Sequence, residues 1–189
     1  AMKEQCARIQ GIALDCAANI YGKIPPSDEY ARRVAALLVG TAAVESAFAH
    51  RRQIGFSWAS TRGGWSLWQL EAGSIQDSLR YLGDREALHR RCEAWLLGPG
   101  GEGQIPWVLD SMLARSSLLY HLQAVATSDR LACLFARLHY MRRPEPVPAT
   151  DKERAFYWKQ FYNTAKGAGT YERYMEAIRE LVHTQAERA

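Results

Sequence analysis

The sequence predicts a mainly α-helical protein, on two observations. Apolar residues recur at spacings of three and four along most of the chain, and runs with the period-two alternation of strands are few. The composition, 48% apolar and 23% charged, is that of a globular protein, and no run approaches the ~20 apolar residues of a membrane-spanning helix. Since 189 residues are typical of one domain, we expect a single mainly α domain over residues 1–189.

The first two helices have clear ends. The apolar stripe of the first predicts a helix over about 3–21, which Gly22 and the following prolines terminate. Ser27 is a good N-cap for the second, predicted over 30–48, because a serine oxygen accepts hydrogen bonds from the free N–H groups of a first turn. Glu45 extends the apolar face of this second helix.

The middle of the chain alternates short helices with loops. Residues 51–64 predict a loop or a short irregular β segment, being rich in Gly, Ser, Thr and aromatic residues. A helix over 74–82, capped by Ser74 or Gly73, and another over 85–97 follow, before an exposed glycine-rich loop at 98–103.

Four further helices complete the chain. We expect them over 108–126, from 128 or 129 to 141, over 151–161 and over 170–183. A proline-rich segment at 142–148 ends the second of these, because proline cannot continue a helix. The helix over 3–21 is expected to pack on this body.

Charge and cysteine content narrow the partners only weakly. A net charge of +4 and a pI near 9.0 suit an anionic partner without naming one. The four cysteines have neither CxxC spacing nor a histidine placed to complete a metal site, so we expect buried, reduced thiols and no metal or organic cofactor. The N-terminus has no apolar signal core, and Ala1 before Met2 is typical of an expression remnant. Synthesis in a reducing cytoplasm is therefore predicted.

Glu45 is the candidate catalytic residue. Glycoside cleavage needs a protonated carboxylic acid near neutral pH, and an apolar, aromatic setting raises a carboxyl pKa by disfavouring the charged form. Such residues cluster around Glu45 in the sequence; they are Val44, Phe48, Phe56, Trp58, Trp65 and Trp68. Aromatic faces also suit stacking on sugar rings. A solvent-exposed glutamate at a helix end is the plainer interpretation of Glu45 taken alone.

Three motifs in order give the context. They are Thr41-Ala42-Ala43-Val44-Glu45-Ser46, then Gly64-Trp65-Ser66-Leu67-Trp68-Gln69-Leu70, then Tyr162-Asn163 ahead of Gly167-Ala168-Gly169. Together they resemble the lysozyme-like superfamily of soluble lytic transglycosylases and goose-type lysozymes, and its phage-borne members in particular. The resemblance covers about residues 31–174. Ser66 departs from it, because that position usually holds glycine, and a side chain there is expected to project towards the substrate.

The resemblance implies a lysozyme-like domain that cleaves peptidoglycan glycan strands with Glu45 as general acid. It implies that Ser46 orients Glu45 or a substrate group, that Gln69 contacts the sugar near the cleaved bond, and that Tyr162 and Asn163 line the opposite wall. Ser66, Trp68, Glu71 and His139 complete the candidate substrate-binding set. A role in a virion or in host lysis, acting on the periplasmic wall, follows from the same resemblance, with phage virion proteins as further partners.

Three alternatives remain open at this stage. A hydrolase needs a second carboxylate, for which Glu71 and Asp77 are candidates, whereas a lytic transglycosylase uses the substrate's own groups; the sequence slightly favours the single acid. A non-catalytic virion or wall-binding module could keep the same fold. A small basic nucleic-acid binder is disfavoured, because no Lys/Arg-dense recognition helix is present in the sequence. A monomer is expected.

Overall fold

The computed structural model confirms the mainly α-helical fold class. It describes residues 2–98, 109, 112, 117–163 and 167–183. The expected loop at 98–103 lies almost wholly outside these residues, as does most of the first half of the helix expected over 108–126. Within the described part of the chain, the only β structure is a pair of isolated bridges that join Arg52 to Trp65 and Trp65 to Leu70. The irregular β segment predicted over 51–64 therefore amounts to one bridge at its start.

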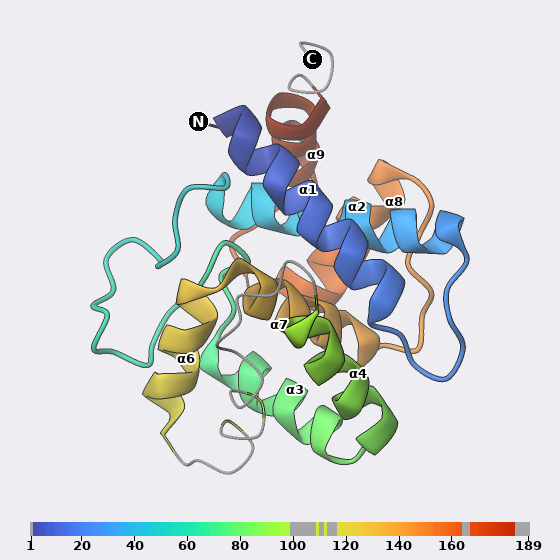
Figure 1. Ribbon diagram of the computed structural model, residues 1–189. Coiled ribbons are helices and arrows are strands. Elements are labelled where there is room, and N and C mark those ends of the chain that lie inside the picture. The colour runs from blue at the N-terminus through green and yellow to red at the C-terminus, as the bar shows by residue number, and fades with distance from the viewer. Residues whose placement is uncertain (1, 99–108, 110–111, 113–116, 164–166, 184–189) are drawn as a thin grey trace.

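Two long helices cross one another in the upper half of the molecule (Figure 1). The helix α1 (Met2–Asn19) lies across α2 (Asp28–Ser46) and also contacts α7 (Asp129–Met141), so the N-terminal helix packs on the body as expected. Ser27 caps α2 by accepting from the Tyr30 amide at 3.2 Å. The helix ends at Ser46, two residues before the predicted end, because Ala47 and Phe48 adopt left-handed φ angles of 50° and 56°.

The helices α3 (Ala72–Gly83) and α4 (Glu86–Leu97) lie below, next to α6 (Leu118–Thr127) and α7 (Figure 1). The predicted N-cap of α3 is wrong. Glu71 occupies the cap position without a side-chain cap bond, and Ser74 lies inside the first turn with its hydroxyl directed to His139. Ser128 caps α7 through a 3.2 Å bond from the Leu131 amide.

The last two predicted helices each change their winding. The first is α8 (Asp151–Trp158), which continues into the π-helix η1 (Lys159–Asn163), and the second is α9 (Tyr171–Ala177), which continues into the π-helix η2 (Ile178–His183). Thr150 and Glu153 form a capping box at the start of α8. Tyr162 and Asn163 both lie on η1, and π-turns are frequent at functional sites.

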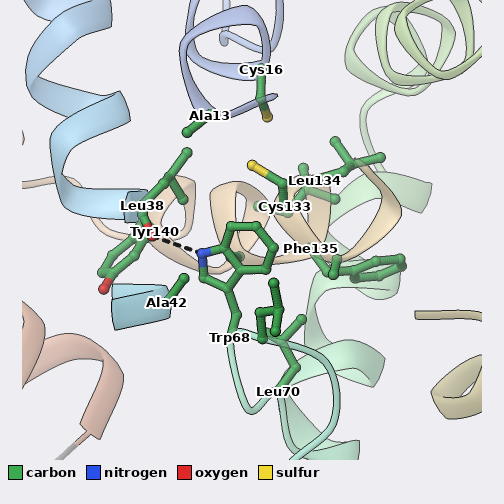
Figure 2. Close-up of a cluster of buried hydrophobic side chains, with 14 of the residues drawn as sticks. Ala13, Cys16, Leu38, Ala42, Trp68, Leu70, Cys133, Leu134, Phe135 and Tyr140 are labelled. Carbon is green, nitrogen blue, oxygen red and sulfur yellow. Dashed lines mark hydrogen bonds between the residues drawn. The ribbon is translucent and has the colours of Figure 1, made fainter. Parts of the chain in front are cut away.

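Trp68 lies at the centre of the core (Figure 2). Its indole N–H donates to the Leu38 carbonyl of α2 at 2.8 Å, and its ring lies among side chains from α2 and α7. Because this bond joins the segment after residue 64 to α2, it sets where Gln69 lies relative to Glu45. All four cysteines are free and buried, as predicted, and Cys16 and Cys133 face one another (Figure 2).

The described residues contain no helix long and apolar enough to cross a bilayer.

Candidate active site

An open cleft of about 940 Å³ runs past the C-terminal end of α2. Most of the residues singled out from the sequence line it: Glu45, Ser46, Gln69, Glu71, His139, Tyr162 and Asn163. They come from α2, the segment before α3, α7 and η1, which lie far apart in the sequence. The fold therefore brings together the three motifs on which the resemblance depends.

Glu45 is half-buried in the last turn of α2. Its Oε1 accepts a 3.0 Å hydrogen bond from the indole N–H of Trp158, a ring that is itself buried. Loss of solvation raises the pKa of the Glu45 carboxyl to about 7, and the negative charge of Glu71 adds to this effect. The donors Trp158 and Asn163 and the charge of Arg173 act in the opposite direction. A large fraction of Glu45 is consequently protonated near neutral pH.

The raised pKa of Glu45 predicts a pH-dependent cost to stability. Below the ordinary value of 4.5, both folded and unfolded chains hold the proton, and the cost is absent. Between pH 4.5 and about 7 the unfolded chain ionises more readily, so stability falls, and above pH 7 the cost is complete. After allowance for partial exposure this cost is about 2 kcal/mol.

The matched variant is Glu45→Gln, which keeps an acceptor for Trp158 but cannot ionise. We expect it to equal the wild type in denaturant unfolding at pH 4 and to exceed it by about 2 kcal/mol at pH 8. Equal stability of the two proteins at both pH values would show that Glu45 titrates as an ordinary exposed glutamate.

Two residues of η1 that line the cleft with Glu45 are fixed by hydrogen bonds. Tyr162 donates its hydroxyl to the Trp68 carbonyl at 2.7 Å, and burial raises the pKa of this phenol well above 10, so it remains a neutral donor. The side-chain oxygen of Asn163 accepts from the Lys159 ammonium at 2.9 Å and from the Gly169 amide at 3.1 Å. With its oxygen engaged in this way, the Asn163 amide presents its N–H₂ group to Glu45, for which it acts as a hydrogen-bond donor.

The Gln69 side chain lines the cleft from a strained position. Its φ is 47°, and its amide donates to the carbonyls of His50 and Ser66, each at 2.8 Å. A Cβ on Gly64 would come within 2.9 Å of three Gln69 atoms, so this close packing requires glycine at position 64. Ala47 and Gln69, which both line the cleft, have left-handed φ angles, and strained backbone of this kind clusters at functional sites.

Two of the predicted substrate-binding residues do not line the cleft. Ser66 is fully buried with φ 66°, and its hydroxyl accepts from the Trp68 amide at 3.3 Å, so the expected projection towards the substrate is wrong. Trp68 is fully buried in the core and does not present its ring to the cleft. The reason is the tight turn at 65–70, which a Trp65–Leu70 bridge closes and which directs both side chains inward.

The other candidates differ in their surroundings. Ser46 lines the cleft, but its hydroxyl donates to the Ala42 carbonyl at 2.9 Å within α2. Glu71 is exposed on the cleft wall. Asp77 also lines the cleft and is paired with Arg80 at 2.6 Å and Arg142 at 3.0 Å. Of the two candidate second carboxylates, Glu71 is the one without an ion pair among the described residues.

The sequence patterns assigned no role to three groups of residues that lie at the cleft. The first is Trp158, which donates to Glu45. The second is a pair of arginines after α7, Arg142 and Arg143. The third is the face of α9 and η2 that lines the cleft, with Arg173, Glu176, Glu180 and Leu181. The α9–η2 residues follow a three-to-four spacing, which indicates a helix face but not what that face covers. Among the described residues, no group of three or more His, Cys, Asp or Glu side chains could hold a metal ion.

Comparisons with protein-family models, with curated proteins and with solved structures found no match for this chain.

Proposed function

We propose that this protein cleaves the glycan strands of peptidoglycan, between the N-acetylmuramic acid and N-acetylglucosamine residues, with Glu45 as the general acid. The observation that carries the proposal is the setting of Glu45, a half-buried carboxyl with a pKa raised to about 7 that opens onto a 940 Å³ cleft. A carboxylic acid in this state can protonate a glycosidic oxygen, as the chemistry of glycoside cleavage requires. The lysozyme-like resemblance supplies the substrate class.

The surroundings of Glu45 support proton transfer from its carboxyl group to the glycosidic oxygen. In the ground state the acid is kept protonated by loss of solvation, which is the largest influence on its pKa. After transfer the carboxylate is stabilised by the Trp158 indole and the Asn163 amide, and by the positive charge of Arg173. These donors stand ready before the reaction, so little reorganisation is needed as the charge develops.

The fate of the sugar cation depends on what attacks its anomeric carbon. If Glu71 activates water or attacks directly, the product has a new reducing end. If the substrate's own hydroxyl attacks, an anhydro sugar forms and no water is consumed. The pairing of Asp77 with two arginines supports Glu71 over Asp77 in the first route. The weak preference from the sequence for a single acid remains a prediction.

Purified glycan strands without stem peptides test this function directly. We expect the wild type to shorten the strands, as measured by size-exclusion chromatography, and the rate to fall as the pH rises through about 7, where Glu45 loses its proton. Co-sedimentation with peptidoglycan but no shortening at any pH would instead favour a non-catalytic wall-binding module.

A further inference from the structure

His139 of α7 lines the cleft yet has its two ring nitrogens engaged. Its Nε2 lies 2.7 Å from the Phe161 carbonyl, and its Nδ1 lies 2.6 Å from the Ser74 hydroxyl and 2.9 Å from an Arg142 guanidinium nitrogen. The ring is buried and stands 4.8 Å from the ring of Tyr162, centroid to centroid. A residue of this kind is poorly placed to contact substrate itself.

These partners define the protonation state of the imidazole. A carbonyl can only accept, so Nε2 carries the hydrogen, and a guanidinium can only donate, so Nδ1 is bare. The neutral Nε2–H tautomer is the one state that satisfies both partners, because an imidazolium would direct an N–H at a cation. Burial, with the positive charges of Arg142 and Arg143, lowers the pKa of His139 to about 4, although the Phe161 bond acts against this.

The Phe161 carbonyl is a site where the chain needs such a donor. It belongs to the last turn of η1, and carbonyls in the last turn of a helix lack partners within that helix. The next two residues are Tyr162 and Asn163, which line the cleft together with Glu45. His139 therefore connects α7 and the first turn of α3 to the segment that presents Asn163 to the acid.

We propose that His139 is a positioning residue, whose neutral ring holds the last turn of η1 so that Asn163 meets Glu45. The effect of His139 on glycan cleavage rests on the proposed function. In this role His139 makes no contact with substrate and transfers no proton. Ser74 of α3, which was predicted as a helix cap, orients the imidazole by donating its hydroxyl to Nδ1.

The test compares His139→Leu with His139→Gln. Leucine removes both hydrogen-bonding positions, whereas the glutamine amide can donate to Phe161 and accept from Ser74. We expect His139→Leu to lower kcat about 10- to 100-fold with KM changed less than about threefold, and His139→Gln to recover most of the loss. The alkaline limb of the pH profile should move upward in His139→Leu, because the Asn163 donor no longer lowers the pKa of Glu45.

Asn163→Ala should shift the same limb, and the double variant with His139→Leu should shift it no further. A loss of activity that lies in KM alone, or an unmoved pH limb in a folded His139→Leu protein, would overturn the proposal. So would independent effects of the two substitutions in the double variant.

A measurement without substrate separates this proposal from the proposed function. In the wild type, ¹⁵N NMR should show His139 as the neutral Nε2–H tautomer down to about pH 5. The titration of Glu45, followed by ¹³C NMR, should lie at a higher pH in His139→Leu than in the wild type. A His139 that titrates near 6.5, or carries its hydrogen on Nδ1, contradicts the positioning role even if the protein cleaves glycan. If no glycan is cleaved, an upward shift of the Glu45 titration in His139→Leu still supports it.

Discussion

Replacing Glu45 by glutamine is expected to lower the rate of glycan cleavage by about 10²- to 10⁴-fold, which is the usual contribution of a general acid. Glutamine keeps the size of the side chain and an oxygen that accepts from the Trp158 indole, but its amide cannot act as an acid. Binding should be retained, because the cleft lining is otherwise unchanged. The measurement is initial rate on purified glycan strands at pH 6, with co-sedimentation on insoluble peptidoglycan to measure binding.

Glu71→Gln is the matched control, since it removes a carboxylate from the same cleft wall. A loss comparable with that of Glu45→Gln would indicate a second catalytic carboxylate, and hence hydrolysis. A small loss, with the Glu45 limb of the pH profile moved downward because a nearby negative charge is gone, would indicate the single-acid route. Activity of Glu45→Gln close to that of the wild type would contradict the assignment of the acid.

The second large effect concerns the contact between α2 and α9. A Cβ on Gly40 would lie 2.1 Å from the Tyr174 hydroxyl oxygen, 2.6 Å from its Cζ and 2.9 Å from the Ile178 Cδ1. Tyr174 is fully buried, so its ring has little room to move. We expect Gly40→Ala to lower the free energy of unfolding by about 1–3 kcal/mol, the usual cost of forcing extra atoms into a packed core.

Gly11 provides the control within the same chain. It lies inside α1 with nothing within 4 Å of an added Cβ, so Gly11→Ala should instead stabilise the protein by about 0.5–1 kcal/mol through helix propensity. Urea unfolding monitored by circular dichroism measures both. Tyr174→Phe should relieve part of the Gly40→Ala penalty, because it removes the nearest atom of the clash. Opposite signs for the two glycine variants are the expected result; destabilisation of equal size at both would contradict this packing.

How far the sequence could predict the fold is clear from these two glycines. Periodicity located most of the helices, Ser27 caps α2 as predicted, and α1 packs on the body as expected. Nothing in the sequence distinguishes Gly40 from Gly11, because both stand inside helical patterns. The difference arises from Tyr174, more than a hundred residues further along the chain. Such long-range contacts are not readable from local pattern.

The candidate site shows the same division. The motif residues Glu45, Gln69, Tyr162 and Asn163 were predicted to come together, and the fold brings them to one cleft. The pattern could not reveal the left-handed turn that buries Ser66, nor the π-helix that follows α8. It also missed that Trp158 donates to Glu45. Each of these depends on a backbone conformation or a partner that tertiary packing selects, overriding local propensity.

The central claim is that this protein cleaves peptidoglycan glycan strands with Glu45 as the general acid. Its most direct test is mass spectrometry of the soluble products that wild type and Glu45→Gln release from purified peptidoglycan. The claim predicts muropeptides from the wild type alone, with anhydro ends for a transglycosylase or reducing ends for a hydrolase. Soluble products from both proteins in equal amount, or from neither across pH 5 to 8, would contradict it.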